Sequence, residues 1–241
     1  MTLQTSVAAA QGFGVVGEVY LAGVMRAQPG IIDSAGADPN ENRVGRVFTQ
    51  GTADGHCNVG GSGVFYGILA NPKVYPLRGI VGDTLAPSLD LPQYAEGEFV
   101  YDTTGLIVTL PAAANVGDDV LYDTTSGVIS TQPSSAPATG AQRVAYASNV
   151  ATVSAVPAGF PPIGVGSQFT TADGQVTTVT SLGTGTGGNG TYNVGTVTDH
   201  AAQAFALAKV AVPSGKARVP GFQVVRFSIP SAGLAVVGNI N

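Results

Sequence analysis

The sequence is poor in charge, has no tryptophan and contains a single cysteine. Charged residues make up 10% of the 241 residues, whereas 34 are glycine and 15 are proline. One cysteine, Cys57, excludes an intrachain disulfide. No run of about 18 apolar residues is present, so we expect no transmembrane helix. The N-terminus lacks the basic start and long apolar centre of a signal peptide, so we expect synthesis in a cytoplasm and no membrane partner.

The residues that are present can still form a core, because the apolar fraction of 44% is ordinary for a folded protein. Low charge with abundant Gly, Thr, Ser and Val is typical of closely packed β structure. Two interpretations of the low charge stay open: neighbours in an assembly cover the surface, or the surface is polar but uncharged. The net charge of −5 argues against a nucleic-acid partner, since affinity for phosphate comes mainly from clustered Lys and Arg.

The most informative stretch runs from Gly63 to Gly79. Its apolar run from Val64 to Leu69 is rich in aromatic and branched residues, and it predicts a strand buried on both faces. Gly67 in the middle indicates a bulge or the close approach of another backbone. Pro72, which has no amide to donate to a sheet, ends the strand.

Two similar segments then predict β-hairpins. Residues 97–107 read G-E-F-V-Y-D-T-T-G-L-I, and residues 117–129 read G-D-D-V-L-Y-D-T-T-S-G-V-I. In each, an Asp can accept backbone amides at a turn and a Gly can adopt the left-handed conformation that closes it.

The remaining segments also favour strands joined by loops. We expect a first strand at Gly17–Leu21, a loop from Arg26 to Asn42, and a glycine-rich loop holding His56 and Cys57. The segment Asp199–Lys209 favours a strand, with a short helix capped by Asp199 as the alternative, and a closing pair of strands is expected at the C-terminus. That closing pair covers Gln223–Ile229 and Leu234–Ile240.

The fold class is therefore all-β: a barrel- or sandwich-like core of short antiparallel strands and hairpins, with a small inserted β subdomain and an extended N-terminal arm. We assign residues 1–16 to the arm and residues 17–143 with 209–241 to the core. The Gly/Thr-rich insertion, residues 144–208, has Asp173 and Asp199 as its only charged residues and a hairpin turn at Asp173-Gly174.

No pattern predicts a catalytic, cofactor-binding or metal-binding residue. Gly183–Gly188 matches the dinucleotide fingerprint by letters, but a strand rather than a helix follows it. His56 and Cys57 are adjacent and would point apart in an extended chain, and too few ligands accompany them for a zinc site. Asp102-Thr-Thr-Gly105 resembles an aspartic-protease motif, yet the extra Thr spoils the match. We expect no enzyme and no cofactor.

Charge is segregated along the chain. Eight acidic residues and no basic one lie between Arg78 and Arg143, whereas four basic residues and no acidic one follow Asp199. Two alternatives stay open. The C-terminal strands pack beside the acidic segments, so that the charges meet within the chain, or one face docks on an oppositely charged partner.

Gly63–Tyr75, G-V-F-Y-G-I-L-A-N-P-K-V-Y, resembles a signature of the structural cement proteins of tailed bacteriophages, and the paired Tyr-Asp-Thr-Thr segments resemble the same family. The resemblance implies a decoration protein on the outer surface of the phage capsid in the virion. Such a protein staples neighbouring major capsid subunits against internal DNA pressure. Its partners would be the major capsid protein and further copies of itself, as a dimer or trimer. The alternative function is a receptor- or glycan-binding accessory protein of a tail or fibre, with the insertion as its binding tip.

The predicted contact residues for the capsid or for a further copy are drawn from the arm, the segment after Pro72 and the basic C-terminal strands. They are Val7, Phe13, Pro72, Tyr75, Arg218 and Arg226.

Overall fold

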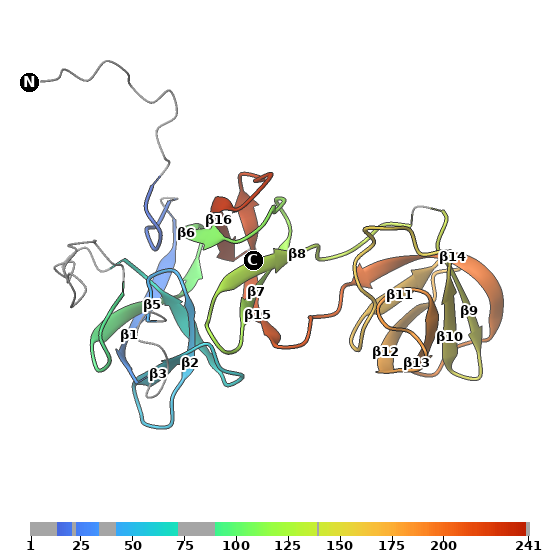
Figure 1. Ribbon diagram of the computed structural model, residues 1–241, viewed down its shortest axis with the longest axis horizontal. Helices are drawn as coiled ribbons and strands as arrows, with labels where there is room; N and C mark the ends of the chain where they lie inside the picture. Colours follow the sequence, from blue (N-terminus) through green and yellow to red (C-terminus); the bar gives the residue numbers. More distant parts are fainter. Residues whose placement is uncertain (1–13, 21–22, 34–41, 72–89, 139, 240–241) are drawn as a thin grey trace, which may run out of the picture.

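The computed structural model describes residues 14–20, 23–33, 42–71, 90–138 and 140–239, and these residues form strands, turns and loops without a helix. The predicted all-β class is confirmed. The strands form two small closed barrels and one open antiparallel sheet, whose strands precede and follow the second barrel along the chain (Figure 1).

The first barrel has the strand order β1-β3-β2-β4-β5. Its strands are β1 (Met25–Ile32), β2 (Val47–Gln50), β3 (His56–Val59), β4 (Phe65–Leu69) and β5 (Glu96–Thr103). Phe48, Leu69 and Phe99 are fully buried inside it.

The open sheet, which we call the middle sheet, has the order β6-β16-β15-β7-β8. Its strands are β6 (Leu106–Leu110), β7 (Asp119–Asp123), β8 (Ile129–Gln132), β15 (Lys216–Arg226) and β16 (Gly233–Asn239). Val47 and Ile68 of the first barrel belong to the same apolar cluster as Val120 and Val237 of this sheet, so the barrel and the sheet share a core.

The second barrel has the order β10-β13-β12-β11-β14-β9. Its strands are β9 (Arg143–Ala147), β10 (Val150–Ser154), β11 (Gln168–Thr171), β12 (Val176–Leu182), β13 (Gly190–Val194) and β14 (His200–Lys209). It has an apolar cluster of its own, centred on Phe169, Tyr192 and Phe205. Figure 1 shows it standing apart from the rest of the described chain, joined by the two segments that flank it.

β4 confirms the predicted strand and bulge, but it begins at Phe65, its residues Phe65 and Tyr66 are half-buried, and the rest of the stretch from Pro72 onward lies outside the described residues. The register with β2 shifts between Phe48 and Thr49, which places a bulge at Tyr66–Gly67. A Cβ added at Gly67 would lie 2.7 Å from Cβ of Phe99 and 2.9 Å from its carbonyl carbon. Glycine is therefore required here because β5 passes directly across it.

One of the two predicted hairpins is confirmed and the other is wrong. β7 and β8 pair directly around the Asp123 turn. β5 and β6 do not pair with each other, because β5 uses its two edges for β1 and β4. β6 instead pairs with β16 and receives a single bridge from Val19.

Three further local predictions need correction. The described part of the segment expected to form the first strand, Gly17 to Tyr20, is not a strand and lies along β6 through the isolated bridge between Val19 and Leu106. The expected loop after Arg26 contains β1, in which Pro29 is tolerated because β3 joins the other edge of the strand only from Ile31 onward. His56 and Cys57 lie in β3 rather than in a loop.

Strand predictions elsewhere are confirmed. Residues 200–209 form β14, the turn at Asp173-Gly174 joins β11 to β12, and β15 and β16 form the closing pair. β15 begins earlier and ends earlier than the predicted Gln223–Ile229, since it runs from Lys216 to Arg226.

Candidate functional site

The basic C-terminal strands meet the acidic segment at the junction of β7 and β15. Nε of Arg218 lies 3.1 Å from Oδ2 of Asp119, with the two side chains 24% and 17% exposed. The same guanidinium donates to the carbonyl of Val210 at 2.6 Å. Nζ of Lys216 donates to Oγ of Ser130 at 2.8 Å. The charges of Arg218 and Asp119 therefore meet within the chain, as the first of the two charge alternatives predicts.

A shallow pocket lies beside this ion pair. β15 bulges away from β7, because Arg218 pairs with Leu121 whereas Gln223 pairs with Asp119. The extra residues of β15 leave a cavity of about 330 Å³ lined by Val120, Val219, Pro220 and Phe222, with Asp119, Arg218 and Gln223 at its polar side. The bulge in β15 produces this cavity.

Arg226 stands in a different environment from Arg218. It is exposed at the end of β15 and makes no ion pair with any described residue. The next residue, Phe227, has φ of 62° and is 43% exposed, with its ring edge-on to Tyr20 at a centroid distance of 5.6 Å. A bulky residue in the left-handed region is strained, and such strain persists only where the surrounding structure imposes it.

The remaining predicted contact residues, Val7, Phe13, Pro72 and Tyr75, lie outside the described residues. Their role, like that of Arg218 and Arg226, stays a prediction.

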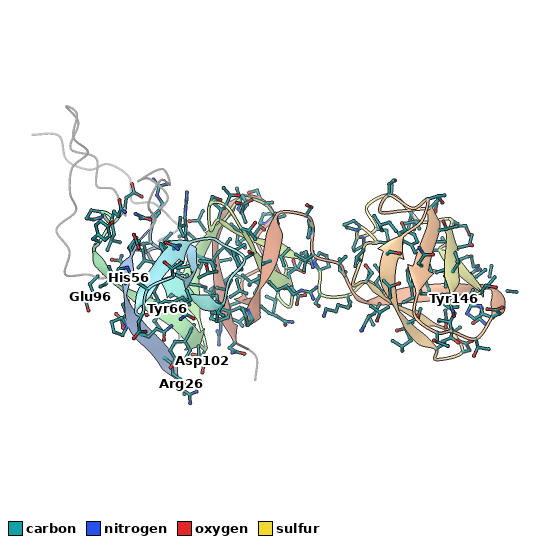
Figure 2. The ribbon with its side chains drawn as sticks, turned by 90° about the horizontal axis from the view of Figure 1, so that it is seen from below. Arg26, His56, Tyr66, Glu96, Asp102 and Tyr146 are labelled. Carbon is teal, nitrogen blue, oxygen red and sulfur yellow. The ribbon has the colours of Figure 1, made fainter. Side chains whose placement is uncertain are left out.

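The only cysteine is a buried core residue. Cys57 is fully buried in the first barrel and its Sγ donates to the carbonyl of Ile31. Burial, reinforced by the charge of Asp33, raises the pKa of this thiol to about 12. Nδ1 of the neighbouring His56 lies 3.3 Å from a carboxylate oxygen of Asp33. Because successive side chains of a strand point to opposite faces, the half-buried imidazole points away from the buried thiol. The pair therefore cannot act as nucleophile and base. Figure 2 shows His56 and Glu96 at one end of the first barrel.

The two Asp-Thr-Thr segments have different structural roles. Oδ1 of Asp123 accepts the amides of Thr125 and Ser126 at 2.9 and 2.8 Å, which lowers the pKa of that carboxyl group. The carboxylate of Asp102 instead lies 3.5 Å from the guanidinium of Arg26. Figure 2 shows this pair at the end of the first barrel opposite to His56 and Glu96.

The glycine-rich segment of the second barrel is an ordered hairpin loop. It joins β12 to β13, so no helix follows it and no dinucleotide site forms. The hydroxyl of Tyr192 donates to the carbonyl of Gly188 at 2.7 Å and accepts the amide of Gly187 at 3.2 Å.

The second barrel uses its acidic side chains internally. Asp199 accepts the amide of Ser148, and Asp173 accepts the hydroxyl of Thr171 and the amide of Gln175. Its large aromatic side chains Tyr146, Phe169, Tyr192 and Phe205 are buried. The described part of this barrel therefore offers no fully exposed aromatic ring on which a sugar could stack.

Within the described residues, no group of three or more His, Cys, Asp or Glu side chains converges as metal ligands. None of the described segments is a helix that is long and apolar enough to cross a membrane.

Two small closed β-barrels and an open antiparallel sheet define an all-β protein. A comparison with family models identifies which one: residues 3–159 match the family described as "Structural cement protein (E217 gp24/Pam3 gp6)". The chain belongs to this family of phage structural cement proteins, and the predicted family and the predicted non-enzymatic, structural role are thereby confirmed. No curated protein matches the sequence.

The match covers only part of the chain. It begins within the arm, covers the first barrel and β6 to β8, and ends just after β10 of the second barrel. β15 and β16 lie outside it.

Proposed function

We propose that this protein binds the outer surface of the phage head in the virion and staples neighbouring major capsid subunits against the pressure of the packaged DNA. Membership of the structural cement family carries the proposal. The net charge of −5 supports a position away from the genome, because a genome-facing protein would need clustered basic residues.

The stapling would be non-covalent and would depend on many repeated contacts. Each copy would contribute modest apolar and polar contacts to the capsid, and simultaneous engagement of several subunits would make weak contacts strong. We assign the capsid contacts to Val7 and Phe13 in the arm (residues 1–16), to Pro72 and Tyr75, and to Arg226. Arg218, whose charge is paired with Asp119, would act mainly by holding β15 in place.

In this proposal the core (residues 17–143 with 209–241) forms the body of the staple. The insertion (residues 144–208) would project from it. The protein would be made in the cytoplasm of the bacterial host and join the head there.

The experiment is co-sedimentation of the purified full chain with phage heads stripped of accessory proteins. We expect saturation at a fixed ratio to the major capsid subunit. A chain that lacks residues 2–14 should bind more weakly because the arm contacts are gone. Binding of only a few copies per head would instead favour the tail or fibre alternative, and the absence of binding would overturn the proposal.

A further inference from the structure

The second barrel includes most of the two segments that connect it to the middle sheet. In the entering segment, Ala136 exchanges two backbone hydrogen bonds of 2.8 Å with Leu207 of β14. Ala136 and Val210 are also part of the apolar cluster of this barrel. In the leaving segment, Ala211 packs against the barrel, since a Cβ added at Gly164 would lie 3.1 Å from Cβ of Ala211. The barrel therefore extends along the chain from Ala136 to Ala211.

Only two short pieces of chain then remain between the second barrel and the middle sheet, residues 133–135 and 212–214. The carbonyl of Gly215 already accepts the amide and the hydroxyl of Thr124, at 2.9 and 3.0 Å, in the turn between β7 and β8. None of the apolar clusters formed by the described residues includes residues of both the middle sheet and the second barrel. Parts of a chain that lack a large apolar interface normally move relative to each other.

Two side chains of the middle sheet nevertheless bind the end of the second barrel. Nη2 of Arg218, in β15, donates to the carbonyl of Val210 at 2.6 Å. The side-chain amide of Gln132, in β8, donates to the carbonyl of Ala211 at 3.1 Å and accepts Nη2 of Arg218 at 3.1 Å, when its oxygen and nitrogen are placed to satisfy both neighbours. We call this pair of side chains, Arg218 and Gln132, the latch.

Charge and burial both strengthen the latch. Nε of Arg218 lies 3.1 Å from Oδ2 of Asp119, and this ion pair holds the guanidinium so that its Nη2 faces the second barrel. A hydrogen bond from a charged donor is stronger than one between neutral groups. Gln132 and Ala211 are each 8% exposed and Val210 is 1% exposed. The latch therefore lies where water has little access and where a carbonyl group without a partner is costly.

We propose that the latch fixes the second barrel to the middle sheet, so that the two tumble in solution as one body. Removal of the latch frees the barrel to reorient about residues 133–135 and 212–214. Arg218 is then a positioning residue, which gives the insertion a fixed direction relative to the core. The inference concerns the free chain, so it does not depend on binding to the phage head.

The test is ¹⁵N NMR relaxation of the full chain, which gives separate rotational correlation times for the middle sheet and the second barrel. In the wild type the two correlation times should be equal. The test variant carries Arg218→Met and Gln132→Met, which keep the side-chain length but remove the hydrogen-bonding groups. In this variant the correlation time of the second barrel should fall at least about 1.5-fold below that of the sheet, because the freed barrel reorients by itself.

Lys216→Met is the matched control. It removes a cation from the same strand together with the bond of 2.8 Å to Oγ of Ser130, but that bond lies within the middle sheet. Its two correlation times should stay equal. Since Arg218→Met leaves the carboxylate of Asp119 unpaired, the latch substitutions are also made together with Asp119→Asn, which removes that charge. Amide chemical shifts within each part show whether the sheet and the barrel remain folded.

Two results would overturn the proposal. The first is a wild-type second barrel with a shorter correlation time than the middle sheet, because the barrel would then move freely although the latch is present. The second is a folded latch variant, with or without Asp119→Asn, whose two correlation times stay equal. Residues 133–135 and 212–214 would then hold the barrel without the latch.

Discussion

The second barrel contains two buried tyrosines whose hydroxyl groups have opposite hydrogen-bonding environments, and this contrast yields a quantitative prediction. Tyr146 and Tyr192 are 2% and 0% exposed. The hydroxyl of Tyr192 makes the two bonds to the glycine-rich loop described above, whereas Oη of Tyr146 has no hydrogen-bond partner among the described residues. The ring of Tyr146 instead packs edge-on against His200 at 4.7 Å.

Removing each hydroxyl should therefore change stability in opposite directions. Tyr192→Phe deletes two bonds and leaves the carbonyl of Gly188 and the amide of Gly187 without this partner, which costs about 1–3 kcal/mol. Tyr146→Phe deletes a buried polar group that lacks a partner among the described residues, so it should be neutral or stabilising by up to about 1 kcal/mol. For a domain of this size, each 1 kcal/mol shifts Tm by about 4–8 °C.

Differential scanning calorimetry of the full chain is the assay, with the second-barrel transition followed in both variants. We expect a lower Tm for Tyr192→Phe and an equal or higher Tm for Tyr146→Phe. A Tyr146→Phe variant that loses as much stability as Tyr192→Phe would refute the reasoning, because its hydroxyl would then be satisfied in the native barrel.

Tyr146 also predicts a dependence of the stability of the second barrel on pH. Burial, together with the charge of Asp173, raises the pKa of Tyr146 in the folded chain. Above pH of about 10 the unfolded chain loses this proton while the folded barrel keeps it, so stability falls as the pH rises. The part of this loss that is due to Tyr146 should disappear in Tyr146→Phe.

Three further predictions follow from other parts of the fold. Cys57 should react with a thiol reagent only when the first barrel opens, and rapid labelling of the native chain at pH of about 8 would contradict this burial. Raising the pH above about 9 should destabilise the first barrel, because the thiol of the unfolded chain ionises before that of the folded chain. Gly67→Ala should lower the free energy of unfolding of the first barrel by about 1–3 kcal/mol in urea unfolding. Gly195→Ala, which has open space around its Cβ, should change the free energy of unfolding little. Equal effects of the two substitutions would show that β5 can move aside for the added Cβ without loss of stability. Residues 141–211 expressed alone should give a cooperative thermal transition, since the second barrel has its own core, and a non-cooperative transition would show that it depends on the middle sheet.

Turns could be predicted from neighbouring residues, whereas the pairing of strands that lie far apart in the sequence could not. The turn at Asp123 was predicted correctly because its carboxylate and Gly127 form it without help from the rest of the chain. The similar turn at Asp102 is one residue shorter, its Asp pairs with Arg26, and the strand that follows it joins another sheet.

At the candidate site, too, features that depend on neighbouring residues could be predicted, whereas features that depend on strand pairing could not. The need for Gly67 could be predicted from its place in an apolar strand, although the identity of its neighbour, Phe99, could not. The segregation of acidic and basic residues indicated that charges would meet, yet only the register of β15 on β7 decides that Arg218 is paired with Asp119 while Arg226 pairs with no described acidic residue. The strained backbone at Tyr94 and Phe227 has no sequence signal, since neither residue type favours a positive φ.

The most direct test of the stapling role is the temperature at which DNA-filled heads, stripped of accessory proteins, release their DNA while the purified protein is titrated onto them. If the protein staples capsid subunits, this temperature should rise with the number of bound copies and reach a plateau when binding saturates. Saturated heads that release their DNA at the same temperature as stripped heads would contradict it, because the protein would then decorate the capsid without holding its subunits together.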